Sequence, residues 1–588
     1  MKTLLDSLSE RMQDAFKKAG YDSKYGKVTF SNRPDLCEFQ CNGAMAAAKE
    51  YKKAPIMIAG DVASLLKEDD AFSDVEAIAP GFLNLKLSGN YLSEFLNNMS
   101  KLDKFGLEEA KDKGKILIDY GGPNVAKPLH VGHLRSAIIG ESVKRICRYM
   151  GNEVVGDIHL GDWGLQMGLI MSEVRERQPE LVYFNPDFDG EYPQESPFTI
   201  SELEEIYPTA STKSKEDAAF KDSAMNDTFE LQNGEKGHTA LWNHIMKVSV
   251  EDLKKNYENL NVSFDWWKGE SDAQKYIPDM VADMKNKGYA YESEGALVVD
   301  VKEESDTKEV PPCMILKSDG ASLYTTTDLA TLVERKEQFD PKQVIYVVDK
   351  RQEMHFIQVF RCAKKTGILS DDVKLNFLGF GTMNGKDGKP FKTREGGVMR
   401  LENLLKDINE EMFKKINDNN EIEESEARQT AKTVALAAVK YGDLSNQATK
   451  DYIFDIDKFT SFEGNTGPYI LYTIVRIKSI LNKYIDGGKT LDNIRINEAS
   501  NESEKGLMLE IVKYNQVIEN AYAELAPHKI CAYIYDVANA FNHFYHENKI
   551  LSESDESRQC GWIALLKLTK EVLESCIDLL GFEAPDRM

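Results

Sequence analysis

Long apolar runs are missing from this chain of 588 residues. No stretch approaches the roughly eighteen consecutive apolar residues that a membrane-spanning helix needs. The N-terminal segment MKTLLDSLSERMQDAFKKAG is a charged amphipathic pattern without the apolar centre of a secretion signal. We therefore expect no membrane partner and a protein that stays in the cytoplasm, where it is made.

Cysteine is scarce, and its spacing excludes the common metal sites. The eight cysteines form no CxxC pair and no cluster with histidine at zinc-ligand spacing. We predict reduced thiols that lie mostly in the core, and no bound metal ion, zinc included.

Basic residues are outnumbered, 73 against 97 acidic ones, which gives a formal charge of −24. Such a balance argues against a protein that coats nucleic acid non-specifically. It does not exclude an RNA that is bound by its shape and a few splayed bases through local basic patches. Composition alone favours an enzyme that acts on small molecules.

The chain is too long for one hydrophobic core, so several domains are expected. Residues 1–108 begin with an amphipathic helix and continue with YGKVTF, the helix QCNGAMAAAKEY and the strand AIAPGFLNLKL. These segments predict a small α+β domain, which the charged turn EEAKDKGK closes.

A nucleotide-binding pattern starts at Lys115. The apolar strand KILIDY leads into a Gly/Pro/Asn turn and then a helix with apolar residues at Leu134, Ile138 and Val143. The next strand, NEVVGDIHL, ends in GDWG, and another helix follows. This order predicts parallel β-α-β winding with ligands at the strand ends, in a Rossmann-type catalytic domain over residues 109–400.

Residues 186–240 are polar and are interpreted as a surface insertion in that domain, before the strands VIYVVD and LNFLGFG return. After about residue 401 no further strand is expected. Long patterns with apolar residues at helical spacing predict an all-α helical bundle over residues 401–588. The predicted fold class is therefore multidomain α/β, with an α+β domain before the catalytic domain and an all-α bundle after it.

The strongest chemical motif is HVGH, residues 130–133, in the first strand-to-helix turn. A glycine between two histidines lets the backbone approach a triphosphate, while the imidazoles and the helix N-terminus face its charge. The alternative is a pair of helix-capping or surface histidines. The position directly after a strand favours the phosphate site.

HxGH also occurs in adenylyltransferases of the pantetheine-phosphate type, so the surrounding residues must decide. The segment DYGGPNVAKPLHVGHLRSAIIGESVKRI resembles the signature of the arginyl-tRNA synthetases of class I. The segments NEVVGDIHLGDWGLQMG, LNVSFDWWKGES, SLYTTTDLATL, YVVDKRQEMHFIQVF, KYGDLSN, FEGNTGPYILYTIVRI and LLGFEAPDRM are similar to that family in the same order. The resemblance covers nearly the whole chain.

The resemblance implies formation of arginyl-adenylate from arginine and ATP, with Mg²⁺ accompanying ATP, and transfer to the terminal adenosine of arginine tRNA. It implies an ATP site made of Lys127, His130, Val131, Gly132 and His133 together with the loop residues Lys392, Thr393 and Arg394. Lys127, His130 and His133 would be the catalytic residues. Thr393 stands where the family's KMSKS loop has its second lysine, and Lys127 is similar to the compensating lysine of members with this departure. Taken alone, Lys127 would be a solvated loop cation.

Arginine recognition requires carboxylates, because a guanidinium is always charged and donates in a fixed fork. Asp328, with Tyr324 one helical turn earlier, matches the family's guanidinium site, and Asp119 would be the second acid. Taken singly, Tyr324 could be a core residue and Asp328 a helix-start acid. The full set that the resemblance implies for arginine is Asp119, Gly122, Pro123, Asn124, His133, His159, Tyr324, Asp328 and Gln352.

The resemblance also implies that residues 1–108 contact the tRNA elbow and that the helical bundle binds the anticodon. Candidate RNA contacts are Phe39, Gln40 and Asn42 in the first domain and Arg587 and Met588 at the C-terminus. Phe39 could equally belong to the small core. The family implies a monomer.

Two alternatives compete with this hypothesis. A catalytically inactive relative that serves as an RNA-binding or scaffolding protein would be favoured by loss of either HVGH histidine, and both are present. A synthetase for cysteine would need a zinc site, and one for glutamate a basic pocket. Asp328 and Asp119 favour arginine over both.

Overall fold

The computed structural model describes residues 1–127, 129–389, 399–417 and 423–588. Its contacts form two compact units: unit 1 contains residues 1–110, 461–578 and 583–588, and unit 2 contains residues 111–460 and 579–582. In the described part of the chain, no helix has both the length and the apolarity to cross a membrane. All eight cysteines are free thiols and seven of them are buried, which confirms the prediction of reduced thiols that lie mostly in the core.

Unit 2 is built on a five-stranded sheet in which every neighbouring pair is parallel. This arrangement confirms the predicted β-α-β winding. In spatial order the strands are β12 (Lys374–Phe380), β11 (Gln343–Asp349), β5 (Lys115–Tyr120), β6 (Glu153–Leu160) and β7 (Trp266–Gly269).

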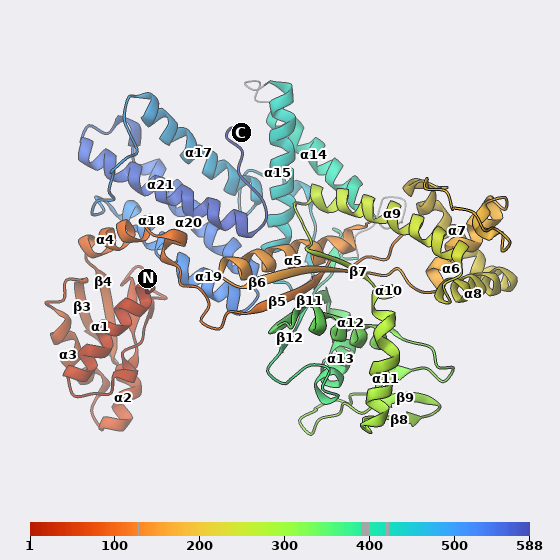
Figure 1. Ribbon diagram of the computed structural model, residues 1–588. Coiled ribbons are helices and arrows are strands. Elements are labelled where there is room, and N and C mark those ends of the chain that lie inside the picture. The colour runs from red at the N-terminus through yellow and green to blue at the C-terminus, as the bar shows by residue number, and fades with distance from the viewer. Residues whose placement is uncertain (128, 390–398, 418–422) are drawn as a thin grey trace. The chain divides into compact units, whose positions relative to one another are not determined.

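Helices cover both faces of this sheet (Figure 1). α5 (Val131–Tyr149) packs against β5, β6 and β11 on one face. α12 (Tyr324–Phe339) and α13 (Glu353–Lys365) share an apolar core with Leu117 and Val344 on the other. Both faces are buried, and for this reason the strand segments read as nearly continuous apolar runs in the sequence.

A helical insertion and a small antiparallel sheet complete the central part of unit 2. α7 and α8 pack on α6 around a separate core of Leu169, Ala210, Phe220 and Ala224, so the polar segment 186–240 is largely helical. The elements are α6 (Leu165–Arg177), α7 (Ile200–Glu216), α8 (Ala218–Gln232), α9 (Lys236–Asn259), α10 (Glu270–Ala273), α11 (Ile277–Asn286), β8 (Ala290–Ser293), β9 (Ala296–Val299) and β10 (Cys313–Leu316).

The helices after residue 401 do not all group with the bundle that the sequence predicts. α14 (Leu401–Asn417), α15 (Glu424–Leu444) and α16 (Ile456–Phe459) belong to unit 2. One reason is the buried ion pair between Arg135 of α5 and Asp443 of α15, with Nε–Oδ1 at 2.8 Å. A short strand, β14 (Tyr452–Ile453), also pairs with β13 (Met383–Asn384). The expectation of no strand beyond about residue 401 was therefore wrong.

Unit 1 contains an antiparallel sheet of order β1-β2-β4-β3 and a helical bundle. The expected single strand AIAPGFLNLKL is two strands, β3 and β4, with Pro80 between them, because proline has no N–H to give to a sheet. The elements are α1 (Leu4–Lys18), β1 (Val28–Phe30), β2 (Phe39–Cys41), α2 (Gly43–Tyr51), α3 (Pro55–Leu66), β3 (Phe72–Ile78), β4 (Phe82–Leu87), α4 (Gly89–Met99), α17 (Gly467–Asp486), α18 (Glu502–Ile511), α19 (Tyr514–Ala523), α20 (Pro527–Glu547) and α21 (Glu556–Leu579).

Candidate active site

A cavity of about 620 Å³ opens at the carboxyl ends of β5, β6 and β11 in unit 2. Strand ends of a parallel sheet are where such folds bind ligands. Pro123 and Lys127 belong to the same β5–α5 turn but not to the cavity wall. Residues predicted from the sequence that line the cavity are Asp119, Gly122, Asn124, His130, Val131, Gly132, His133, His159, Tyr324, Asp328 and Gln352.

The two histidines of the β5–α5 turn cap α5 and also line the cavity. His130 is the N-cap residue, and its Nδ1 accepts the Gly132 N–H at 3.0 Å. Nδ1 of His133 accepts the His130 N–H at 3.2 Å. A ring nitrogen that accepts an N–H carries no proton, so each ring holds its proton on Nε2. Capping and ligand binding are therefore compatible roles for this pair.

The electrostatics of the turn keep both rings neutral. Burial, followed by the neighbouring His130, lowers the pKa of His133 to about 3. Burial and the Lys127 charge also lower the pKa of His130. At neutral pH the turn therefore offers two Nε2–H donors at the N-terminus of α5, whose first amides are already bonded within the protein. This set is suited to a phosphate oxyanion.

Two carboxylates face the cavity from different elements. Asp328, in the second turn of α12, accepts a hydrogen bond from His355 Nε2 at 2.5 Å if that nitrogen carries the proton. Glu270 follows β7 directly, and burial, with the charges of Asp162 and Asp328, raises the pKa of its carboxyl to about 8. Like charges that raise the pKa of the Glu270 carboxyl favour a cation between them. The acidic end of the cavity is thus suited to a guanidinium.

Asp119 also lines the cavity, but its carboxylate is paired inside the protein. Arg335 of α12 donates from Nη2 to Asp119 and from Nε to Asp157 Oδ2 at 2.9 Å. Its Nη1 donates to the Tyr346 hydroxyl at 2.9 Å. The Arg335 side chain is 1% exposed and that of Asp157 is fully buried, whereas Asp119 is 15% exposed where it lines the cavity. This cluster of charges joins α12 to β5, β6 and β11. Its guanidinium also pairs with Asp119, the acid predicted to bind the substrate.

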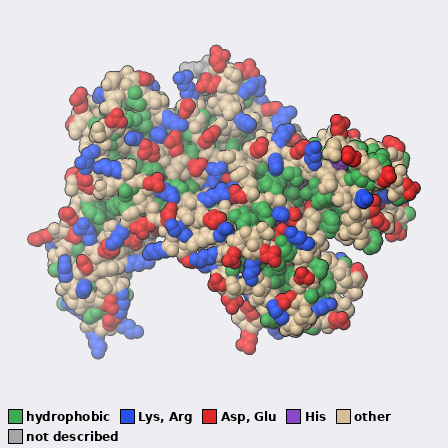
Figure 2. Space-filling model, viewed as in Figure 1, with side chains coloured by type: hydrophobic (Ala, Val, Ile, Leu, Met, Phe, Trp, Pro, Cys, Tyr) green, Lys and Arg blue, Asp and Glu red, His purple; other side chains and the backbone are tan. Residues whose placement is uncertain are grey.

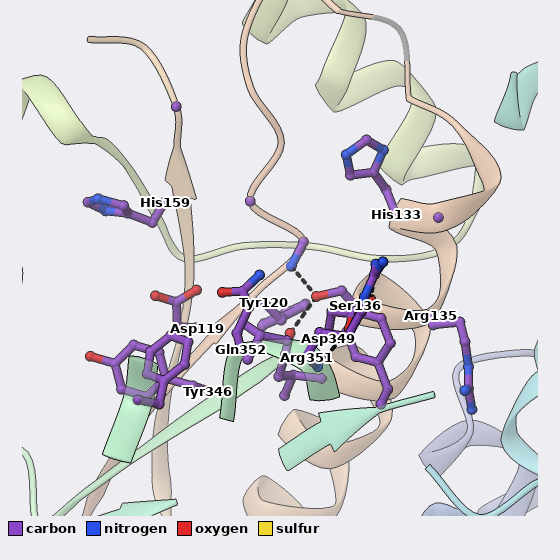
Figure 3. Close-up of a pocket in the computed structure, with 18 of the residues that line it drawn as sticks. Asp119, Tyr120, His133, Arg135, Ser136, His159, Tyr346, Asp349, Arg351 and Gln352 are labelled. Carbon is purple, nitrogen blue, oxygen red and sulfur yellow. Dashed lines mark hydrogen bonds and ion pairs between the residues drawn. The ribbon is translucent and has the colours of Figure 1, made fainter. Parts of the chain in front are cut away.

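Two further polar residues shape the cavity (Figure 3). The Ser136 hydroxyl accepts the Gly121 N–H at 2.8 Å and donates to the Val347 carbonyl at 2.7 Å, so it ties α5 to the ends of β5 and β11. Neither ring nitrogen of His159 has a hydrogen-bond partner among the described residues. Burial and the Arg335 charge lower the pKa of His159, which leaves a neutral ring with both polar atoms available.

Of the four loop residues predicted for the ATP site, the structure describes Lys127. The Lys127 ammonium lies 4.3 Å from the centroid of the Tyr207 ring. Lys392, Thr393 and Arg394 lie outside the described residues. Val131 donates its N–H at 3.1 Å to the carbonyl of Met399, the first described residue after position 398.

The RNA candidates of the first domain differ in accessibility. Phe39 is fully buried, with its ring centroid 5.1 Å from that of Phe30, so the core alternative holds for it and the ring cannot stack on a base. Gln40 is half-buried and donates to Asn84 Oδ1 at 2.8 Å. Asn42 is exposed, and its side chain makes no capping bond to α2.

In the helical bundle, aromatic and polar side chains gather on α17 and α20. The Arg476 guanidinium lies over the rings of Tyr472 and Tyr545, at 4.6 and 5.1 Å from their centroids. Both rings are partly exposed, at 40% and 36%. Arg476 Nη1 also donates to Asn542 Oδ1 at 2.7 Å. Arg587 is exposed and Met588 half-buried at the C-terminus.

Sequence reasoning missed Glu270, Ser136, Arg335 and the Tyr472–Arg476–Tyr545 group. Glu270 could have been found, because an acid that directly follows the strand WWKG must lie at the ligand-binding edge of the sheet. Arg335 carried no such signal, since its partners are up to 216 positions away in the chain.

Comparison with known proteins gives three family matches that together span most of the sequence. Residues 94–456 match the family described as tRNA synthetases class I (R), catalytic domain. Residues 470–588 match the DALR anticodon binding domain, and residues 2–87 match the arginyl tRNA synthetase N terminal domain.

Whole-chain relatives agree with these matches. The chain is 66% identical to an arginine–tRNA ligase of Agathobacter rectalis and 56% identical to one of Alkaliphilus oremlandii, with all of both chains covered in each case. The arginyl-tRNA synthetase structure from Plasmodium falciparum superposes with a TM-score of 0.81 at 25% identity, again over all of both chains. That from Thermus thermophilus has a TM-score of 0.80 at 21% identity and supports the fold.

Proposed function

The chain belongs to the arginyl-tRNA synthetases of class I, and from this membership we propose how its residues divide the work of joining arginine to tRNA. The reaction has two steps. Arginine and ATP form arginyl-adenylate and pyrophosphate, and the arginyl group then moves to the 3′-terminal adenosine of arginine tRNA. One observation carries the proposal: a single cavity holds both the HVGH turn and a pair of carboxylates.

ATP binds at the HVGH end of the cavity. The Nε2–H groups of His130 and His133, at the positive end of α5, donate to the phosphates as charge develops on them. Gly132 is needed because a Cβ there would lie 2.7 Å from the His130 ring. Lys127, with Lys392, Thr393 and Arg394, supplies the loop contacts. ATP enters with Mg²⁺ across its phosphates, as in other phosphate chemistry.

Arginine binds at the acidic end. Its guanidinium is paired by Asp328 and Glu270, with the exposed Tyr324 ring covering it. Asn124, Gln352 and the free ring of His159 bind the amino-acid end, in the turn that contains Gly122 and Pro123. Asp119 acts in this scheme through Arg335: the pair fixes α12 and therefore the position of Asp328.

Transfer requires tRNA, and the match of residues 470–588 to an anticodon binding domain supports tRNA contacts in the bundle. We assign anticodon stacking to Tyr472 and Tyr545, held by Arg476 between them, because exposed rings and guanidinium planes bind unstacked bases. Asn42 and Gln40 are the elbow contacts of the first domain. Arg587 and Met588 remain proposed contacts at the C-terminus. The protein works as a monomer in the cytoplasm.

The proposal is tested by incubating the protein with ATP, all the standard amino acids and total tRNA. Arginine should be the amino acid that becomes attached. Attachment of another amino acid would refute the carboxylate pocket, and attachment of none would favour the inactive alternative. Sedimentation of the purified chain tests the monomer.

A further inference from the structure

Helix α7 of the insertion presents an aromatic ring to the Lys127 ammonium. The Tyr207 ring is half-buried, and its centroid lies 4.3 Å from Lys127 Nζ. The ring also packs against the small core of Leu169, Ala210 and Phe220. It is therefore held from behind by the insertion while its face meets the cation, an arrangement that stabilises an ammonium.

The turn before Lys127 is shaped to deliver that side chain. Ala126 adopts a left-handed conformation, with φ of 57°, which is unfavourable for alanine and must be held by its surroundings. Its N–H donates to Ser249 Oγ of α9 at 3.0 Å, and the Val125 N–H donates to the Gly161 carbonyl at 3.1 Å. The backbone before the lysine is thus fixed on two sides.

One turn away on α7, a carboxylate holds a second cation near the HVGH turn. Glu204 Oε2 lies 2.6 Å from Arg400 Nη1, and the Glu204 side chain is only 11% exposed. Arg400 forms a backbone bridge with His130, and Leu401 donates its N–H to the Leu129 carbonyl at 2.8 Å. Helix α7 therefore contacts both Lys127, which precedes the motif, and Arg400, whose backbone pairs with the motif.

From these contacts we infer that Tyr207 is a positioning residue for Lys127. Through Tyr207 and Glu204, α7 holds Lys127 and Arg400 beside the HVGH turn, where the ATP phosphates are proposed to bind. The inference rests on the proposed role of Lys127 in that site. A lysine on its four-carbon stem has many rotamers, and fixing it before the reaction removes an entropic cost from the transition state. The insertion thereby contributes to catalysis without touching a substrate.

The test compares Tyr207→Leu, which removes the aromatic face, with Tyr207→Phe, which keeps it. In arginine-dependent ATP–pyrophosphate exchange with cognate tRNA present, Tyr207→Leu should lower kcat about three- to thirtyfold, the range expected for a lost cation–π contact. The KM for arginine should stay unchanged, and Tyr207→Phe should restore the parental rate. Tyr192→Leu is the matched control, because Tyr192 stacks on Tyr183 in the same insertion and should leave the rate unchanged.

A double-mutant cycle of Tyr207→Leu with Lys127→Ala separates this inference from the proposed role of Lys127 in the ATP site. In the Lys127→Ala background, Tyr207→Leu should cause no further loss. A full additional loss would show that Tyr207 acts independently of the lysine and would overturn the inference. A normal rate for Tyr207→Leu beside an impaired Lys127→Ala would also overturn it. A normal rate for Lys127→Ala would remove the lysine from the ATP site and the positioning role with it. If Tyr207→Leu melts early, Tyr207→Met, which refills the space without a ring, takes its place.

Discussion

At the scale of single residues, Asp328 tests the assignment of arginine. Its carboxylate and the substrate guanidinium are both partly removed from water, so each needs the other. Asp328→Asn replaces one acceptor with a donor that faces the guanidinium's own donors. We expect the specificity constant for arginine to fall by about 2 to 5 kcal/mol, on the order of thirtyfold to several thousandfold. Steady-state charging at varied arginine measures it.

The KM for ATP is the internal control, because the nucleotide is assigned to the HVGH end. Asp328→Asn also removes the charged partner of His355, which is hydrogen-bonded to Asp328. His355→Gln should therefore change charging less than Asp328→Asn does. An asparagine variant that charges arginine within about threefold of the parent, well below the expected loss, would mean that another group reads the guanidinium.

Glu270 gives a pH prediction with a definite sign. Burial and the charges of Asp162 and Asp328 raise the pKa of its carboxyl to about 8, so below that pH it is protonated. Binding a guanidinium requires the ionised form, and the proton must leave. The specificity constant for arginine should therefore rise with pH, by up to about tenfold per unit between roughly pH 6 and 8, and then level off.

The substrate guanidinium stays charged throughout this range, and the pKa of His133, about 3, keeps that histidine neutral. Glu270→Gln should flatten the profile as well as lower it. The comparison matters because the pKa of the buried Asp162 is also raised, to about 6. A slope that persists in Glu270→Gln would assign the titration to a group other than Glu270.

At the scale of elements, the sequence predicted what local patterns control. The strand KILIDY, the turn and the helix after HVGH appear as β5 and α5, and their parallel pairing follows from the need to bury both faces. Strand ends meet at one edge of the sheet, which brings the turns after β5 and β6 to the cavity, whereas Tyr324 and Asp328 on α12 were predicted from the family resemblance.

What the sequence could not predict depends on long-range partners. Asp119 looks like a free acid at a strand end, and only the fold brings Arg335 to it across 216 positions. Phe39 in EFQCN resembles an RNA-stacking ring, but the pleat of β2 turns it into the core. Tyr207 stands in a polar segment with no motif, and its contact with Lys127 needs both the insertion and the turn to be folded.

The link between α5 and α15 allows a stability prediction for unit 2. Arg135 Nε lies 2.8 Å from Asp443 Oδ1, and the two side chains are 2% and 0% exposed. Arg135 Nη1 also donates to the Gly381 carbonyl at 2.7 Å. Asp443→Asn leaves a buried guanidinium without its counter-charge and should lower the free energy of unfolding by about 3 to 5 kcal/mol.

Urea unfolding followed by tryptophan fluorescence is the appropriate measurement, because four of the five tryptophans lie in unit 2. Asp283→Asn is the matched control. Its ion pair with Lys287 is exposed, at 51% and 55%, and its loss should leave the free energy of unfolding nearly unchanged. Equal losses in the two variants would show that the buried pair is not what holds α15 to α5.

At the scale of the whole molecule, the charge of −24 has to be reconciled with an RNA substrate. Acidic and basic side chains are interspersed over the face shown in Figure 2. We therefore propose that tRNA is bound at local sites such as Arg476 with its two rings, while the acidic background repels RNAs that lack the matching shape. Selectivity in such a protein comes partly from repulsion.

The last prediction concerns the dependence of the first chemical step on tRNA. Arginine activation waits for bound tRNA in the family that this chain resembles, and we expect the same here. With ATP, arginine and pyrophosphate alone, exchange should be negligible, and cognate tRNA should start it. Because phosphate contacts release counterions, raising salt from about 50 to 200 mM should weaken tRNA binding by orders of magnitude. Exchange should fall in parallel and recover when more tRNA is added.

That recovery separates lost RNA binding from a direct salt effect on the cavity. Non-cognate tRNA is the control, and it should start exchange poorly at every salt concentration. Arg476→Ala should raise the tRNA concentration needed for half-maximal exchange without changing the plateau, since the residue is assigned to RNA alone. Robust exchange with no RNA present would show that the cavity is complete without tRNA, and the activation step would then be independent of the bundle.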